Sequence, residues 1–64
     1  MKRIDLQKHL RAHGCAFQRD GGDHARWVNL ATGATASINR HREIPTATGK
    51  QVCKQLGVPP PPFK

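Results

Sequence analysis

One short stretch of the chain combines the residue types that acid–base chemistry on an anionic substrate needs. Residues 19–27 read RDGGDHARW, in which two glycines precede a single histidine, His24, and an arginine lies on either side of it. Histidine suits proton transfer because its side chain titrates close to physiological pH. The two arginines, Arg19 and Arg26, can bind phosphate. His24 is therefore the candidate general acid or base, although a surface histidine at the start of a strand is the simpler interpretation of the spacing alone.

The charge of the chain favours an anionic partner. Its 64 residues include 11 Lys and Arg against 4 Asp and Glu, a formal net charge of +7 at pH 7. So strong a field attracts polyanions, and nucleic acid gains affinity because each neutralised phosphate releases counterions. A solvated basic surface without a ligand is the alternative. A membrane surface fits less well, because no apolar helical stripe accompanies the scattered positive charges.

The length and the segment composition predict one small cytoplasmic domain. A chain this short buries about 60% of the surface that its unfolded form exposes, so we expect function on a surface or a shallow groove. No apolar run is long enough to span a membrane, and the start of the chain lacks the apolar segment of a secretory signal. Cys15 and Cys53 are too few for a disulfide framework, so we expect two thiols in a reducing compartment.

Hydrophobic spacing and turn residues predict an α+β fold. Helices are expected at residues 4–13, ended by Gly14, and from Pro45 or Thr46 to Gly57. Three short strands with glycine-containing turns are expected at residues 15–19, 24–30 and 34–39. This α-β-β-β-α order predicts a three-stranded antiparallel sheet with two helices on one face. Residues 1–58 form the expected domain, and residues 59–64 form a proline-rich tail in the polyproline II conformation, most simply a disordered end.

The orientation of Trp27, the only tryptophan, stays open. Alternate side chains of a strand point to opposite faces, which groups His24 and Arg26 with Val28, and Trp27 with Asn29. Each group contains both apolar and polar side chains, so the pattern does not decide which group the helices cover. Trp27 either packs in the core, stacks on a nucleobase or anchors a protein partner.

An ordered set of short motifs resembles the HicA (YcfA-like) toxin family. The motifs cover roughly residues 3–58 and read HGC at 13–15, RDGGDH at 19–24, RHREI at 40–44 and KQVCKQLG at 50–57. The resemblance implies a fold similar to double-stranded RNA-binding domains. It also implies a ribonuclease of a bacterial type II toxin–antitoxin pair that degrades mRNA and is neutralised by a HicB antitoxin. The chain departs from the family pattern at Asp23, where Ser or Asn is common, and at Asn39, where Pro is common.

The resemblance also assigns the chemistry. The catalytic histidine of the family follows the glycine turn, and that position is His24 here. RNA carries its own nucleophile, the 2′-hydroxyl, so one histidine and positioned cations suffice and we expect no metal or cofactor. The expected RNA-binding residues, each with a plain alternative as a turn residue or a solvated side chain, are Gly22, Arg19, Arg26, Arg40, His41 and Arg42. His41 is also a candidate second proton carrier. We expect the toxin to be monomeric within a larger complex with an acidic antitoxin.

Three other functions remain open at this point. A non-catalytic RNA-binding module of the same fold would carry the same charge. An inactive toxin that still binds its antitoxin would carry the same motifs. A zinc-stabilised DNA-binding ribbon would use His9, His13 and Cys15, although this spacing lacks an evident fourth ligand.

Overall fold

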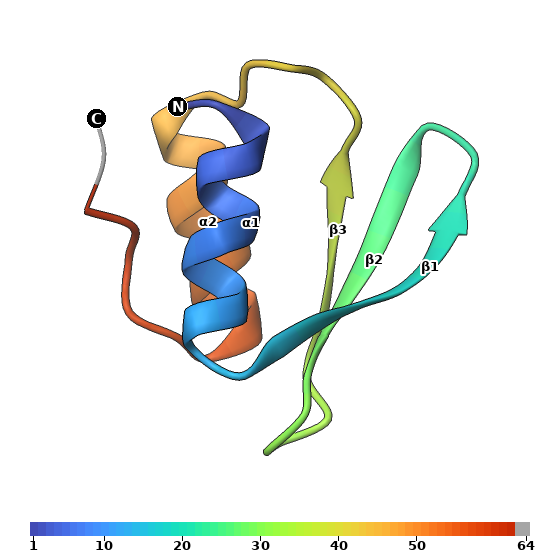
Figure 1. The fold of residues 1–64 in the computed structure, drawn as a ribbon, viewed down its shortest axis with the longest axis vertical. Helices are drawn as coiled ribbons and strands as arrows, with labels where there is room; N and C mark the ends of the chain where they lie inside the picture. Colours follow the sequence, from blue (N-terminus) through green and yellow to red (C-terminus); the bar gives the residue numbers. More distant parts are fainter. Residues whose placement is uncertain (63–64) are drawn as a thin grey trace.

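The computed structural model describes residues 1–62 and confirms the α-β-β-β-α order and the antiparallel sheet (Figure 1). The strands lie in the order β1-β2-β3, α1 contacts β1, and α2 contacts β3. In Figure 1, α1 is drawn in front of α2 on the same side of the sheet, and the β1–β2 hairpin reaches away from both helices. The elements are α1 (Arg3–Ala12), β1 (Cys15–Gly21), β2 (His24–Asn29), β3 (Thr35–Asn39) and α2 (Thr46–Leu56). Neither helix is long and apolar enough to cross a bilayer in the part of the chain that the structure describes.

The β1–β2 hairpin turns one residue later than the glycine pair predicts. Gly21 is still part of β1 and pairs with His24, so the loop consists of Gly22 and Asp23. Gly22 has a φ of 69°. A two-residue hairpin loop needs a positive φ at its first position, which glycine adopts without steric cost.

A β-bulge interrupts β1 halfway along. Phe17 pairs with Trp27 and Arg19 pairs with Arg26, which leaves Gln18 as an extra residue. Because one extra residue reverses the alternation of side chains, Phe17 and Arg19 lie on opposite faces of the sheet. Phe17 shares the helix-covered face with Trp27, and Arg19 shares the open face with Arg26.

A single core lies between the sheet and the helices, and it decides the orientation of Trp27. The indole is 1% exposed, as is Ile38 of β3, the residue that the pattern of residues 34–39 favours for the core. The helices contribute, among others, Leu6 and Leu10 of α1 and Val52 and Leu56 of α2. Trp27 is therefore a core residue, and His24 and Arg26 lie on the open face.

The buried polar residue Asn29 explains why its strand face can be covered. Its Nδ2 donates a hydrogen bond to the Leu56 carbonyl at 2.7 Å, and its Oδ1 accepts one from the Ala31 amide at 2.9 Å. A buried amide is tolerated when its donors and acceptors are paired. The first of these bonds satisfies a carbonyl at the end of α2, which Gly57 terminates in the left-handed conformation with φ 73°.

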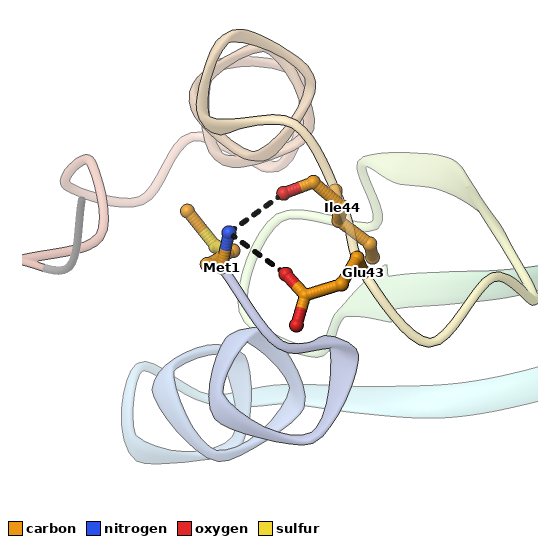
Figure 2. Close-up of polar contacts among 3 residues, drawn as sticks. All are labelled: Met1, Glu43 and Ile44. Atoms are coloured by element: carbon orange, nitrogen blue, oxygen red, sulfur yellow. Dashed lines mark hydrogen bonds and ion pairs between the residues drawn. The ribbon is translucent and has the colours of Figure 1, made fainter.

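The first residue of the chain ties α1 to the loop before α2 (Figure 2). The amino group of Met1 donates to the Ile44 carbonyl at 2.8 Å and lies 3.8 Å from a carboxylate oxygen of Glu43. The Ile44 amide in turn donates to the Met1 carbonyl at 2.8 Å. The Met1 side chain covers Gly49 of α2, where an added Cβ would lie 2.7 Å from the Met1 methyl carbon. Gly49 therefore makes room for this contact at some cost in helix propensity.

The second helix begins where the sequence predicts, whereas the proline tail differs from the prediction. α2 starts at Thr46, Pro45 is the residue before its first turn, and no side chain caps the helix. The beginning of the proline tail is packed: Pro61 is buried, and the Pro59 carbonyl lies 2.9 Å from a ring nitrogen of His9. The tail returns along the helices because α2 ends beside α1. Residues 63 and 64 of the expected tail lie outside the described residues.

The two cysteines are buried in the core as free thiols. Burial raises the pKa of Cys15 above its ordinary value of 9.0, and burial together with the nearby Cys15 raises the pKa of Cys53. The folded state therefore holds these protons more tightly than the unfolded state does. The resulting stability is complete below the ordinary value and declines as the pH rises above it, because the unfolded thiols then ionise first.

We expect the urea midpoint of unfolding to fall as the pH is raised past 9.0. A double Cys15→Ala, Cys53→Ala variant should start from a lower midpoint but show a weaker decline. An equal decline in both proteins would show that other groups cause the alkaline destabilisation.

Candidate nucleic-acid interface

His24 is the first residue of β2 and is exposed on the open face of the sheet. Its partners in the register are Gly21 on β1 and Asn39 on β3. Because glycine has no side chain and asparagine has a short one, neither strand neighbour covers the imidazole. The hairpin thus presents His24 at an accessible end of the sheet.

The next row of the open face is basic. Arg26 pairs with Arg19 on one side and with Ser37 on the other. These residues and His24 line one shallow hollow, the arginine hollow, whose full lining is Arg19, Asp20, Gly21, His24, Arg26 and Ser37. The structure therefore brings together three of the residues expected from the sequence, and adds Asp20, Gly21 and Ser37.

The direct pairing of Arg19 with Arg26 is unfavourable for the sheet itself. Like charges opposite each other on neighbouring strands destabilise the pair. A bound phosphate would neutralise both guanidinium groups and accept hydrogen bonds from them. The arrangement is therefore better explained by an anionic ligand than by stability.

A second hollow, the loop hollow, also includes His24. It is lined by Asp23, His24, Asn39, Arg40 and His41. Backbone bonds hold the loop in place: the Arg40 amide donates to the Asp23 carbonyl at 3.2 Å, and the His41 amide donates to the side-chain oxygen of Asn39 at 3.3 Å. Asn39, which replaces the common proline, thus fixes the end of β3 through its side chain.

Arg40 and Asp20 form an exposed ion pair that joins the end of β3 to β1. Their side chains are 51% and 55% exposed. Exposed pairs of this kind contribute about 0–1 kcal/mol, so a phosphate can replace the carboxylate on Arg40 at little cost. No ion pair joins Asp23 to His24, although both line the loop hollow.

The structure separates the remaining expected residues from His24. Arg42 lines neither hollow that contains His24; it lies instead beside α1, with Lys2, Arg3, Ile4 and Gln7. Its carbonyl accepts a hydrogen bond from the Arg3 amide at 2.9 Å. Gly22 lies in the exposed hairpin loop next to the loop hollow without lining it.

The zinc alternative involves His9 and His13 on or after α1 and Cys15 at the start of β1. The His9 and His13 rings lie with their centroids 4.4 Å apart, and Nδ1 of His13 lies 2.9 Å from the His9 carbonyl. Cys15 is buried in the core. Within residues 1–62, no group of three or more His, Cys, Asp or Glu side chains could hold a metal ion.

Comparison with known families places this geometry in context. A family model described as the HicA toxin of bacterial toxin–antitoxin systems matches residues 4–58, which is most of the chain. The chain belongs to the HicA toxin family. No curated protein and no solved structure matched. A HicA toxin works as one half of a toxin–antitoxin pair, so its protein partner is an antitoxin.

The matched range contains the whole proposed interface of this HicA-family chain and ends before the prolines. Three residues that line the arginine hollow were not among the expected site residues: Asp20, Gly21 and Ser37. Ser37 lies two residues before Asn39, the partner of His24 on β3. Strand alternation alone could therefore have placed Ser37 on the same face as His24. Asp20 had no comparable signal, because its position depends on the bulge at Gln18.

Proposed function

We propose that this HicA-family toxin is a cytoplasmic endoribonuclease that cleaves mRNA with His24 as general acid or base, and that a HicB-like antitoxin neutralises it by covering the same face. The observation that supports this best is the position of His24, exposed between the arginine hollow and the loop hollow. A proton-transfer group flanked by cations suits reaction at a phosphodiester.

The reaction needs no group beyond those on the open face. His24 takes the proton of the 2′-hydroxyl, whose oxygen forms a bond to the adjacent phosphorus. The bond from phosphorus to the 5′ oxygen breaks, and that oxygen receives a proton, which leaves a 2′,3′-cyclic phosphate and a 5′-hydroxyl. Arg19 and Arg26 neutralise the charge that develops on the phosphorane. His41, the other imidazole in the loop hollow, is the candidate donor to the leaving oxygen.

The chemistry of the products tests the proposal. Purified protein is incubated with mRNA in the presence of a metal chelator, and the new RNA ends are identified. We expect fragments that end in 2′,3′-cyclic phosphate and begin with 5′-hydroxyl, and growth arrest on expression that the antitoxin relieves. Intact RNA, or fragments with 5′-phosphate, would reject this mechanism.

A non-catalytic RNA-binding module is the second candidate. The paired arginines beside Ser37 favour it, because a phosphate-binding row needs no proton transfer. In that case RNA would bind without being cut, and replacing His24 would change binding only slightly.

Arg26→Thr separates ligand binding from fold stability. Threonine favours strands, and the substitution removes the repulsion between residue 26 and Arg19. We therefore expect the free energy of unfolding, measured in urea, to rise by about 0.2–1 kcal/mol. RNA binding should weaken. The slope of the logarithm of the binding constant against the logarithm of the salt concentration should fall by about the amount due to one phosphate contact. The measurements are urea unfolding and RNA titration at several salt concentrations. Weaker binding together with lower stability would instead indicate that Arg26 supports the fold.

A further inference from the structure

Part of the helix-side face of the sheet is left uncovered beside α1. There, a hollow of about 460 Å³ lies between α1 and the β1–β2 hairpin. We call it the aromatic hollow; Phe17 and Trp27 line it, together with Arg3 and Gln7 of α1 and Arg40 after β3. It is distinct from the open face that carries Arg19 and Arg26.

Phe17 is only partly buried in this hollow, so half of its aromatic ring is open to a ligand. The ring is 48% exposed, and it meets Trp27 edge to face with centroids 6.3 Å apart and planes at 79°. Pairing with Trp27 places Phe17 on the helix side, yet α1 covers it only in part. An exposed aromatic ring offers a flat apolar face on which a nucleobase can stack.

The wall of the same hollow contains an unpaired donor. Nε1 of Trp27 is buried, and no acceptor within residues 1–62 lies within hydrogen-bond distance of it. An unpaired buried donor is unusual in a folded protein.

Arg40 connects the aromatic hollow to the histidine. It lines both the aromatic hollow and the loop hollow, which also contains His24. On the α1 side, Nη1 of Arg3 donates to the Arg40 carbonyl at 2.6 Å, which holds the Arg3 side chain against the backbone of Arg40. A strand whose phosphate rests on Arg40 would have one nucleotide within reach of the aromatic hollow and the next phosphate near His24.

We propose that the aromatic hollow binds one unpaired nucleobase of the RNA, next to the nucleotide that is cut at His24. The position of the base next to the cut nucleotide rests on the proposed ribonuclease function. The binding of the base does not, because binding does not require cleavage. The exposed Phe17 ring and the continuity with the His24 hollow through Arg40 favour RNA over a segment of the antitoxin. Base stacking on Phe17 then contributes to the choice of cleavage position.

The test measures RNA binding to proteins that cannot cut. Each variant carries His24→Ala, and binding of a short fluorescein-labelled single-stranded RNA is followed by anisotropy. Phe17→Leu keeps an apolar side chain and removes the aromatic face, Phe17→Tyr keeps the face, and Leu30→Ala changes an apolar residue that is 72% exposed outside the hollow. Circular dichroism confirms that each variant is folded.

We expect Phe17→Leu to weaken binding by about 5- to 150-fold, the range for the loss of one stacked base. Phe17→Tyr and Leu30→Ala should bind as the parent does, and the salt slope should stay the same because no phosphate contact is lost. In the cutting protein, Phe17→Leu should also shift the distribution of cleavage positions.

Each other outcome has a defined meaning. Unchanged RNA binding by Phe17→Leu overturns the inference, even if the parent protein cuts RNA, and weaker antitoxin binding in that case would assign the hollow to the protein partner. If the wild-type protein does not cut RNA but Phe17→Leu still weakens binding, the base site stands and the proposed ribonuclease function fails.

Discussion

Replacing Trp27 with alanine is expected to unfold most of the protein at physiological temperature. The indole is the largest fully buried side chain, and it belongs to the core to which both helices contribute. Removing a buried tryptophan or phenylalanine side chain costs about 3–5 kcal/mol. A domain of this size has a total stability of roughly 3–10 kcal/mol, at about 0.05–0.15 kcal/mol per residue. The substitution therefore removes a large part or all of it.

Circular dichroism in urea measures this effect, because the only tryptophan is then absent. Leu30→Ala is the matched control: Leu30 is also apolar and close to β2, but it is 72% exposed. Its free energy of unfolding should differ from that of the wild type by no more than about 0.5 kcal/mol. A folded Trp27→Ala variant with a similar midpoint would mean that the helices, and not the indole, hold the core together.

The helices and strands could be predicted because their signals are local. Leu6 and Leu10, spaced one turn apart, identify α1, and both are fully buried. Gly14 and Gly57 mark the ends of the helices, and both adopt positive φ. Each of these features depends on residues a few positions away, which the sequence shows directly.

The face of β2 could not be predicted because long-range contacts decide it. Asn29 makes its strand face look polar, but its amide is satisfied by the Leu56 carbonyl, a residue 27 positions away. Arg11 of α1 further lies over the Trp27 ring, with its guanidinium carbon 5.1 Å from the centroid. Neither partner is apparent from the alternation of residues 24–30.

The composition of the candidate site depends on one extra residue. Uninterrupted alternation would place Phe17 and Arg19 on the same face, whereas the bulge at Gln18 sends Arg19 to the face of His24. A bulge leaves no reliable mark in a single sequence. The residues of the RHR motif also separate: Arg40 and His41 line the loop hollow, while Arg42 lies beside α1.

The second large expected effect concerns activity and not stability. We expect His24→Ala to reduce RNA cleavage by about 10²–10⁴-fold, the usual contribution of one proton-transfer group. Its stability should change by no more than about 0.5 kcal/mol, because the side chain is exposed. Expression of the variant should no longer arrest growth, while binding to the antitoxin should largely persist.

His13→Ala is the matched control for this variant. His13 is also exposed, and it follows α1 without lining either hollow that contains His24. Its replacement removes a histidine and leaves the arginine row unchanged. Full activity of His13→Ala would exclude a general effect of losing an imidazole.

The most direct measurement of the central claim is the single-turnover rate of RNA cleavage by wild type, His24→Ala and His13→Ala, each shown to be folded by circular dichroism. We expect wild type and His13→Ala to cut at the same rate, and His24→Ala to be slower by about 10²-fold or more. Cleavage by folded His24→Ala at the wild-type rate would contradict the assignment of His24 as the catalytic residue.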